Sequence, residues 1–105
     1  MTDLDPTALK ARLDQPNPPI LLDVRERWEY DRAKLPDATL IPLAQLKEKV
    51  STLDPEAEYV VYCHHGGRSA SAAQFLRSQG FGKVANLEGG IDAWSLEVDA
   101  TVARY

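Results

Sequence analysis

Residues 59–69 read Tyr59-Val60-Val61-Tyr62-Cys63-His64-His65-Gly66-Gly67-Arg68-Ser69, an apolar run that gives way to a glycine loop. The apolar, β-branched part is typical of a strand buried on both faces of a parallel sheet. An alanine-rich run with helical spacing follows, from Ala70 to Gln79. The only cysteine of the chain is therefore expected where a strand ends and a tight loop leads into a helix.

Strand and helix patterns alternate on both sides of this stretch. Strands are expected at 20–24, 39–41 and 84–87, and helices after Asp5-Pro6, at 25–32, at 43–50 and after Gly89-Gly90. This alternation predicts an α/β fold, an open and mostly parallel sheet with helices on both faces. Ligands bind such sheets at the carboxyl ends of the strands, where the Cys63 loop is expected to lie.

A few other residues carry specific expectations. Trp28 and Trp94 are interpreted as anchors of the core. Arg25 is expected to form a structural ion pair with Asp23 or Glu29, because buried charges are usually paired. The tail, residues 97–105, has little periodicity and is expected to pack on the surface.

The bulk composition limits the class of protein. With 105 residues, we expect one domain spanning 1–105. The net charge of −4 argues against nucleic acid or an anionic membrane surface as a partner. No stretch approaches the roughly 18 apolar residues of a membrane span. The acidic segment 1–5 has no apolar signal core, and the lone cysteine excludes an internal disulfide, so a cytoplasmic protein is expected.

The loop has features that favour a reactive thiolate. A helix N-terminus stabilises an anion, and successive amides of a glycine loop can converge on one. Gly66 and Gly67 allow the positive φ values that such a loop needs. Arg68 adds a permanent positive charge, and Ser69 is expected to cap the helix and to offer a hydroxyl donor.

Two plainer interpretations compete with this one. A lone cysteine after a buried strand is most often an inert core residue, but the glycine pair and Arg68 favour a reactive one. A metal site made of Cys63, His64 and His65 is disfavoured, because three consecutive side chains in a turn rarely converge on one ion. The two imidazoles either line the mouth of the loop or are ordinary loop residues.

The spacing of Cys63, four residues, Arg68 and Ser69 resembles the active-site loop of the rhodanese family, the single-domain sulfurtransferases. Three other segments resemble signatures of that family. They are residues 21–26 with 28–30, residues 35–38 with 41–43, and residues 86–91 with Ala93 and Trp94. The similarity runs in order over roughly residues 4 to 95, which makes coincidence unlikely.

The resemblance implies a five-stranded parallel sheet and transfer of sulfane sulfur. Cys63 would attack thiosulfate or another persulfide donor, hold the sulfur as a persulfide and pass it to cyanide or a thiol. A protein sulfur acceptor is a further candidate partner, and no metal or organic cofactor is implied. The substrate-binding residues implied are His64, His65, Gly66, Gly67, Arg68 and Ser69.

The chain departs from the family at two places. Residues 33–38 replace a Gly-His-Ile-Pro-Gly-Ala turn, where a local change is expected. Glu29 lies where some thiosulfate-using members are basic, and an acid there is expected to repel an anionic donor.

Two alternative functions remain at this point. Phosphatases and arsenate reductases of the same fold have a loop one residue longer, and the shorter loop here favours a single sulfur atom over a tetrahedral oxyanion. A non-catalytic interaction module is the other alternative, although inactive members of the family usually lack the cysteine that this chain keeps.

Overall fold

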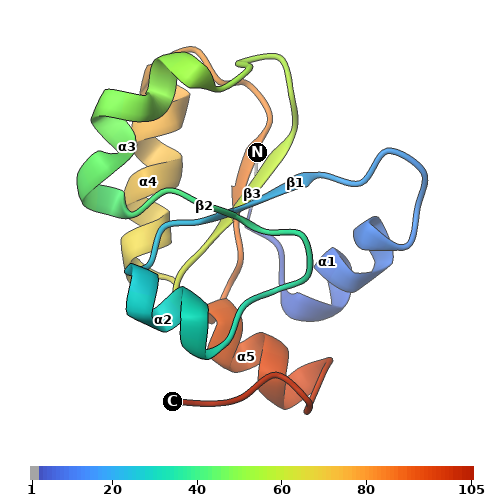
Figure 1. Ribbon diagram of the computed structural model, residues 1–105. Helices are drawn as coiled ribbons and strands as arrows, with labels where there is room; N and C mark the ends of the chain where they lie inside the picture. Colours follow the sequence, from blue (N-terminus) through green and yellow to red (C-terminus); the bar gives the residue numbers. More distant parts are fainter. Residues whose placement is uncertain (1–2) are drawn as a thin grey trace.

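A parallel sheet of four strands lies at the centre of the chain (Figure 1). The strands are β1 (Ile20–Asp23), β2 (Thr39–Leu40), β3 (Tyr59–Tyr62) and β4 (Val84–Asn86), in the order β2-β1-β3-β4. This computed structural model describes residues 3–105. Met1 and Thr2, which belong to the acidic segment considered above, lie outside the described residues. The α/β class and the parallel sheet are confirmed.

The fifth strand that the resemblance implied is reduced to a single bridge at the edge of the sheet. Leu4 pairs with Leu87 in an isolated parallel bridge, and its amide donates to the Asn86 carbonyl at 3.0 Å. The pairing ends there because Asp5 caps the following helix and Pro6 has no amide proton to give. The described residues therefore form four strands rather than five.

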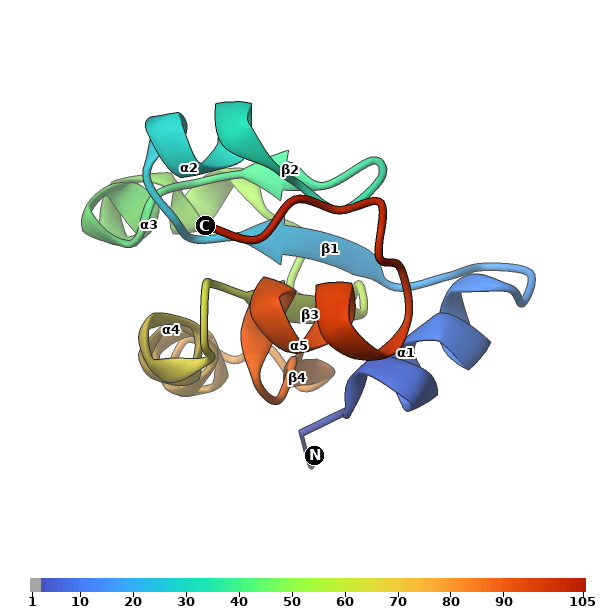
Figure 2. The same cartoon turned by 90° about the horizontal axis from the view of Figure 1, so that it is seen from below.

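Helices cover both faces of the sheet (Figures 1 and 2). They are α1 (Pro6–Leu13), α2 (Arg27–Arg32), α3 (Leu43–Lys49), the 3₁₀ turn η1 (Val50–Thr52), α4 (Gly67–Ser78) and α5 (Gly90–Glu97). Residues of α3 and α4 share one core cluster with the sheet, and residues of α1 and α5 share the other. The four expected helices flanking the central stretch are confirmed.

The core consists of two layers because side chains alternate across each buried strand. On β3, Val61 faces the α3–α4 layer, whereas Val60 and Tyr62 face the α1–α5 layer. Trp94 is buried in the second layer, as expected, but Trp28 is 62% exposed. The prediction for Trp28 was wrong because α2 directly follows the carboxyl end of β1 and does not contribute to either core cluster.

Helix α4 begins earlier than the alanine pattern suggested. Gly66 is its N-cap residue with a φ of +105°, so the helix starts at Gly67. Ser69 therefore lies in the first turn and does not cap the helix, and only Gly66 of the pair has a positive φ. Gly80, with a φ of +92°, follows the end of the helix as expected.

Candidate active site

Cys63 lies at the carboxyl end of β3, where the chain turns into α4. Its side chain is buried, with 1% of the residue exposed. The sulfur lies 3.1 Å from the Gly66 amide nitrogen and 3.4 Å from both the amide nitrogen and the hydroxyl of Ser69. Donors from the loop and from the first turn of α4 thus converge on one sulfur atom, as the glycine pattern predicted.

The donors and the burial act on the thiol in opposite directions. Burial raises the pKa of the Cys63 thiol, because it disfavours the charged form. Hydrogen bonds from the Ser69 hydroxyl and from the amides of Ser69, Gly66 and Arg68 outweigh this, and the pKa falls below its ordinary value. The loop therefore favours a thiolate at a buried position.

The guanidinium of Arg68 is paired with an acid. Its two terminal nitrogens lie 2.6 and 2.8 Å from the carboxylate oxygens of Glu29, a bidentate pair. This pair holds the pKa of Glu29 at about 2, despite the opposing effect of burial. Arg68 thus acts on the thiolate through its backbone amide and through its charge, which is shared with Glu29.

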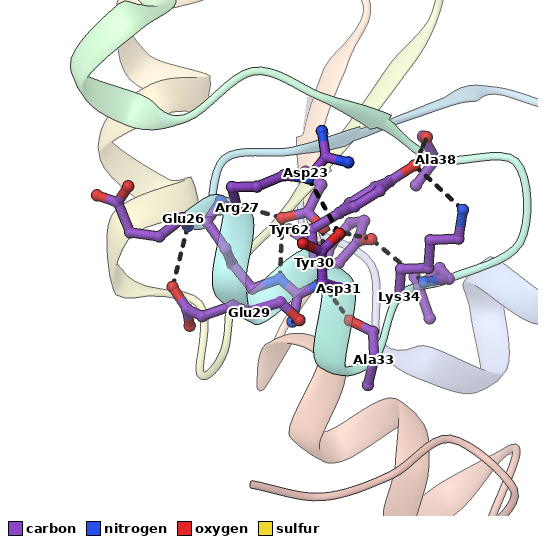
Figure 3. Close-up of polar contacts among 12 residues, drawn as sticks. Asp23, Glu26, Arg27, Glu29, Tyr30, Asp31, Ala33, Lys34, Ala38 and Tyr62 are labelled. Atoms are coloured by element: carbon purple, nitrogen blue, oxygen red, sulfur yellow. Dashed lines mark hydrogen bonds and ion pairs between the residues drawn. The ribbon is translucent and has the colours of Figure 1, made fainter.

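Glu29 is held in place by its own helix. It lies at the third position of α2, where its side chain accepts from the Glu26 amide at 3.0 Å (Figure 3). The Glu26 side chain accepts in return from the Glu29 backbone, which completes a capping box. A local helix-start signal therefore positions an acid at the loop.

A buried polar network lies below the loop. Arg25 and Asp23 form a bidentate pair with distances of 2.9 and 2.6 Å, and both side chains are fully buried. The Tyr62 hydroxyl donates to Asp23 at 2.8 Å (Figure 3) and accepts from the Leu35 amide at 3.2 Å. Of the two partners considered for Arg25, the structure selects the carboxylate of Asp23; Glu29 offers Arg25 only its carbonyl oxygen.

Tyr105 belongs to the tail that was expected to pack on the surface, and its side chain contacts residues at the loop. The Tyr105 hydroxyl donates to Glu29 at 2.8 Å and accepts from Arg25 at 2.8 Å. Its ring stacks on that of His64, which in turn stacks on that of His65, with 4.1 Å between the ring centroids in both pairs. Burial, first, and the charge of Glu29 raise the pKa of Tyr105 to about 12, although Arg25 opposes this shift.

The two histidines have different environments. The pKa of His64 is lowered, mainly by burial and then by the neighbouring His65. His65 has a side chain that is 70% exposed, and its Nδ1 lies 3.9 Å from a carboxylate oxygen of Asp92. This arrangement places both rings beside the loop, with His65 toward solvent.

Helix α5 fixes the outer side of the loop. The amides of Ile91 and Asp92 donate to the carbonyls of Cys63 and His64 at 2.9 and 3.1 Å. Gly90 makes this approach possible, because a Cβ there would lie 2.4 Å from both carbonyl oxygens. The end of β3 and the start of α5 are thus joined directly.

Asn86 is a site residue that the sequence reasoning missed. It ends β4, is 6% exposed, and contacts Ser69 and Gly66 through its side chain. The signal was available, since a polar residue that ends a buried parallel strand lies at the ligand-binding edge. Tyr105 was also missed, and the aperiodic tail offered no signal for it.

The structure brings together the loop residues that the sequence singled out, except Gly67, which is the first residue of α4 and makes no side-chain contact. Cys63, Gly66 and Ser69 meet at the sulfur, Arg68 lies on Glu29, and His64 and His65 stack beside the loop. Among residues 3–105, no group of three or more His, Cys, Asp or Glu side chains is arranged to hold a metal ion. Over the same residues, no helix has the length and apolar character needed to cross a membrane.

Comparison with known proteins adds a family context to this geometry. The sequence model of the rhodanese-like domain family matches residues 5–97 of this chain. A sulfurtransferase of Allochromatium vinosum is 34% identical, over 90% of this chain and 89% of that protein. The chloroplastic rhodanese-like/PpiC domain-containing protein 12 of Arabidopsis thaliana is 44% identical over 81% of this chain, which spans only 30% of that longer protein.

Solved structures agree with the sequence matches. The crystal structure of a rhodanese-related protein from Thermoplasma volcanium superimposes with a TM-score of 0.85. It is 32% identical, and the match covers 93% of this chain and 94% of that one.

Proposed function

The chain belongs to the rhodanese-like domain family, and we propose from this that it is a sulfurtransferase that carries sulfane sulfur on Cys63. The observation that supports the proposal most directly is the set of amide and hydroxyl donors around the Cys63 sulfur. In this proposal the described domain works as one unit, and its substrates are a small sulfur donor and a thiophilic acceptor.

The first half-reaction loads the enzyme. The Cys63 thiolate attacks the outer sulfur of thiosulfate, a new S–S bond forms, and sulfite leaves with the electron pair of the broken bond. With another persulfide donor, the leaving group is the donor's thiolate. The enzyme is left with a persulfide on Cys63, and neither a metal nor an organic cofactor takes part.

The second half-reaction unloads it. The sulfur of a thiolate or the carbon of cyanide attacks the terminal sulfur, and Cys63 leaves as a thiolate. Each leaving or attacking sulfur is anionic, so the loop amides stabilise the same kind of charge in both steps. The loop residues 64–69 are proposed as the substrate-binding segment, with Gly66 and Ser69 as the donors.

The charge balance at the loop bears on the donor. Because Glu29 neutralises Arg68, an anionic donor gains less attraction from that guanidinium than the sequence alone suggested. The loop amides remain as the main anion-binding groups. We therefore propose that thiosulfate and an organic persulfide are both candidate donors, and that both bind mainly through the loop amides.

An intact-mass measurement tests this proposal. The protein is incubated with thiosulfate, and in parallel with an organic persulfide, and a gain of one sulfur atom that cyanide reverses is the expected result. Cys63→Ala should show no gain, whereas Ser78→Ala, at the far end of α4, should behave as wild type. No adduct with either donor would contradict the proposal. Hydrolysis of a phosphate ester would then favour the phosphatase alternative, and neither activity in a folded protein would favour an interaction module.

A further inference from the structure

The hydroxyl of Ser69 has more acceptors within reach than it has protons. Its oxygen lies 3.4 Å from the Cys63 sulfur, 3.2 Å from the Gly66 carbonyl oxygen and 2.5 Å from Oδ1 of Asn86. A hydroxyl carries one proton and donates to one acceptor at a time. The contact with Asn86 is the shortest, so Asn86 competes with the sulfur for this proton.

The orientation of the Asn86 amide follows from its second contact. Its nitrogen lies 3.2 Å from the Gly66 carbonyl oxygen, which can only accept a hydrogen bond. The donor Nδ2 must therefore face Gly66, and Oδ1 must face Ser69. Because Asn86 ends β4 and is buried, the sheet itself holds this acceptor against the hydroxyl.

The preferred acceptor of the Ser69 proton depends on the charge of the sulfur. A neutral thiol is a weak acceptor, so the hydroxyl donates to Asn86 and its lone pairs are free to accept from the thiol. An anionic sulfur is a much better acceptor, because hydrogen bonds to charged groups are about twice as strong as neutral ones. Ionisation of the sulfur therefore favours rotation of the hydroxyl toward it.

We propose that Asn86 is a positioning residue that holds the Ser69 proton away from the neutral sulfur and releases it when the sulfur becomes anionic. The proton that leaves the thiol goes to solvent. The Ser69 hydroxyl only rotates, and no covalent bond of Ser69 or Asn86 changes. Asn86 therefore raises the thiol pKa of Cys63 above the value that the loop donors would give without it. In this way a residue at the end of β4 influences the ionisation of Cys63.

The charged groups around the loop do not explain such a coupling. Most of them are paired with one another: Glu29 with Arg68, Asp23 with Arg25, and Asp92 with Arg104. The other titratable groups are the loop residues His64 and His65, of which His65 also lies near Asp92. None of them contacts the Asn86 side chain, whose hydrogen bonds go to Ser69 and Gly66. Substitution of Asn86 leaves these charges unchanged.

The test is a double-mutant cycle on the pKa of the thiol. Asn86→Leu removes the nearer of the two oxygens that compete with the sulfur, and leaves the Gly66 carbonyl, which already accepts from the Ala70 amide at 3.0 Å, as the more distant one. The pH dependence of alkylation by iodoacetamide should then show a thiol pKa lower by roughly half a unit to one unit, the size of one ordinary hydrogen bond. In a Ser69→Ala background, Asn86→Leu should leave the thiol pKa unchanged.

Other results would overturn the proposal. An unchanged or raised pKa in Asn86→Leu would mean that Asn86 does not compete for the proton. An equal shift with and without Ser69 would mean that Asn86 acts on the loop backbone. A cooperative thermal transition checks folding, and Asn86→Ala replaces the leucine variant if that variant fails to fold. Since iodoacetamide needs no sulfur donor, the result does not depend on whether Cys63 forms a persulfide.

Discussion

Glu29 is an acid held between cationic and hydroxyl groups at the loop, and its contacts define its effect on stability. It accepts two hydrogen bonds from Arg68, one from Tyr105 and one from the Glu26 amide. The residue is 3% exposed, so its charge depends on these partners more than on water.

The low pKa of Glu29 predicts a defined dependence of stability on pH. Its pKa is about 2 in the folded chain against an ordinary value of 4.5, so its ionised form stabilises the fold above that ordinary value. This contribution is lost as the pH falls from about 4.5 to about 2. Glu29→Gln should lower the free energy of unfolding at neutral pH by roughly 1 to 3 kcal/mol. Plotted against pH, the unfolding free energies of the variant and of wild type should converge as the pH approaches about 2. Urea unfolding at a series of pH values measures this.

The exposed Glu48 on α3 supplies a matched control. Glu48→Gln should follow the wild-type curve within about 0.5 kcal/mol at every pH. A constant offset between Glu29→Gln and wild type across the whole pH range would show that the charge of Glu29 is not the stabilising feature.

Single residues differed in how far the sequence could specify them. An ion pair of Arg25 with Asp23 or Glu29, and the position of Cys63 at the end of a strand, were predicted from residues that are close in sequence. The pairing of Arg68 with Glu29 joins residues 39 positions apart, and Tyr105 reaches Glu29 over 76 positions. Such contacts depend on how the elements pack, and no local pattern reports them.

At the scale of elements, the loop is shaped by two helices. Helix α4 supplies the amides that face the sulfur, and α5 supplies the amides that bind the outer carbonyls of Cys63 and His64. The closeness of α5 depends on Gly90, which has a φ of +62° and no room for a side chain.

Gly90→Ala should therefore damage the loop. The added Cβ would clash with two backbone carbonyls and strain a positive φ, and we expect a loss of roughly 2 to 4 kcal/mol in unfolding free energy. The thiol should also react more slowly with iodoacetamide at neutral pH, because the amide arrangement that stabilises its thiolate is disturbed. Unfolding titrations and alkylation rates measure the two effects.

Gly82→Ala is the comparison variant for this prediction. A Cβ at Gly82 would meet nothing within 4 Å, and Gly82 is not among the glycines with positive φ. The variant should remain within about 0.5 kcal/mol of wild type. If the two alanine variants lost the same stability, the close packing of α5 on the loop would not be the cause.

The sequence placed every α-helix among residues 3–105 but not every helix boundary, and it did not predict the 3₁₀ turn η1. The alanine spacing of 70–79 marks the apolar face of α4, and the true start at Gly67 depends on the backbone turn at Gly66. The periodicity of apolar residues cannot report such a turn, and Ser69 was for that reason interpreted as a cap. Similarly, Trp28 lies on a correctly predicted helix that packs against neither core cluster.

At the scale of the whole molecule, the sheet has a buried centre and weak edges. Strand β3 pairs with β1 and β4, whereas β2 has two residues and pairs only with β1. The α/β alternation in the sequence sufficed to predict this layered arrangement. It did not predict that the fifth strand would be a single bridge at Leu4, since that outcome depends on where α1 begins.

Native-state hydrogen exchange should reflect this architecture. We expect the amides of Val60 and Val61 on β3 to exchange slowest, because their exposure requires global unfolding. The amide of Ile41, which directly follows β2 and donates to the Asp23 carbonyl at 2.9 Å, should exchange faster by roughly two orders of magnitude or more, through local opening of the edge. Measurement of exchange by NMR at low denaturant tests both statements. Equal protection of β2 and β3 would show that the sheet opens as one unit.

The contact between α5 and the loop has a consequence for protein engineering. The carbonyls of Cys63 and His64 accept from amides of α5, so the backbone at the start of the loop is held by a helix that lies more than 25 residues later in the chain. A seven-residue graft of 63–69 into a foreign scaffold would lack these two hydrogen bonds, and its loop would not be held in this conformation. The smallest portable unit consists of two separate pieces, residues 59–70 and residues 84–92, together with a host that holds two parallel strands side by side.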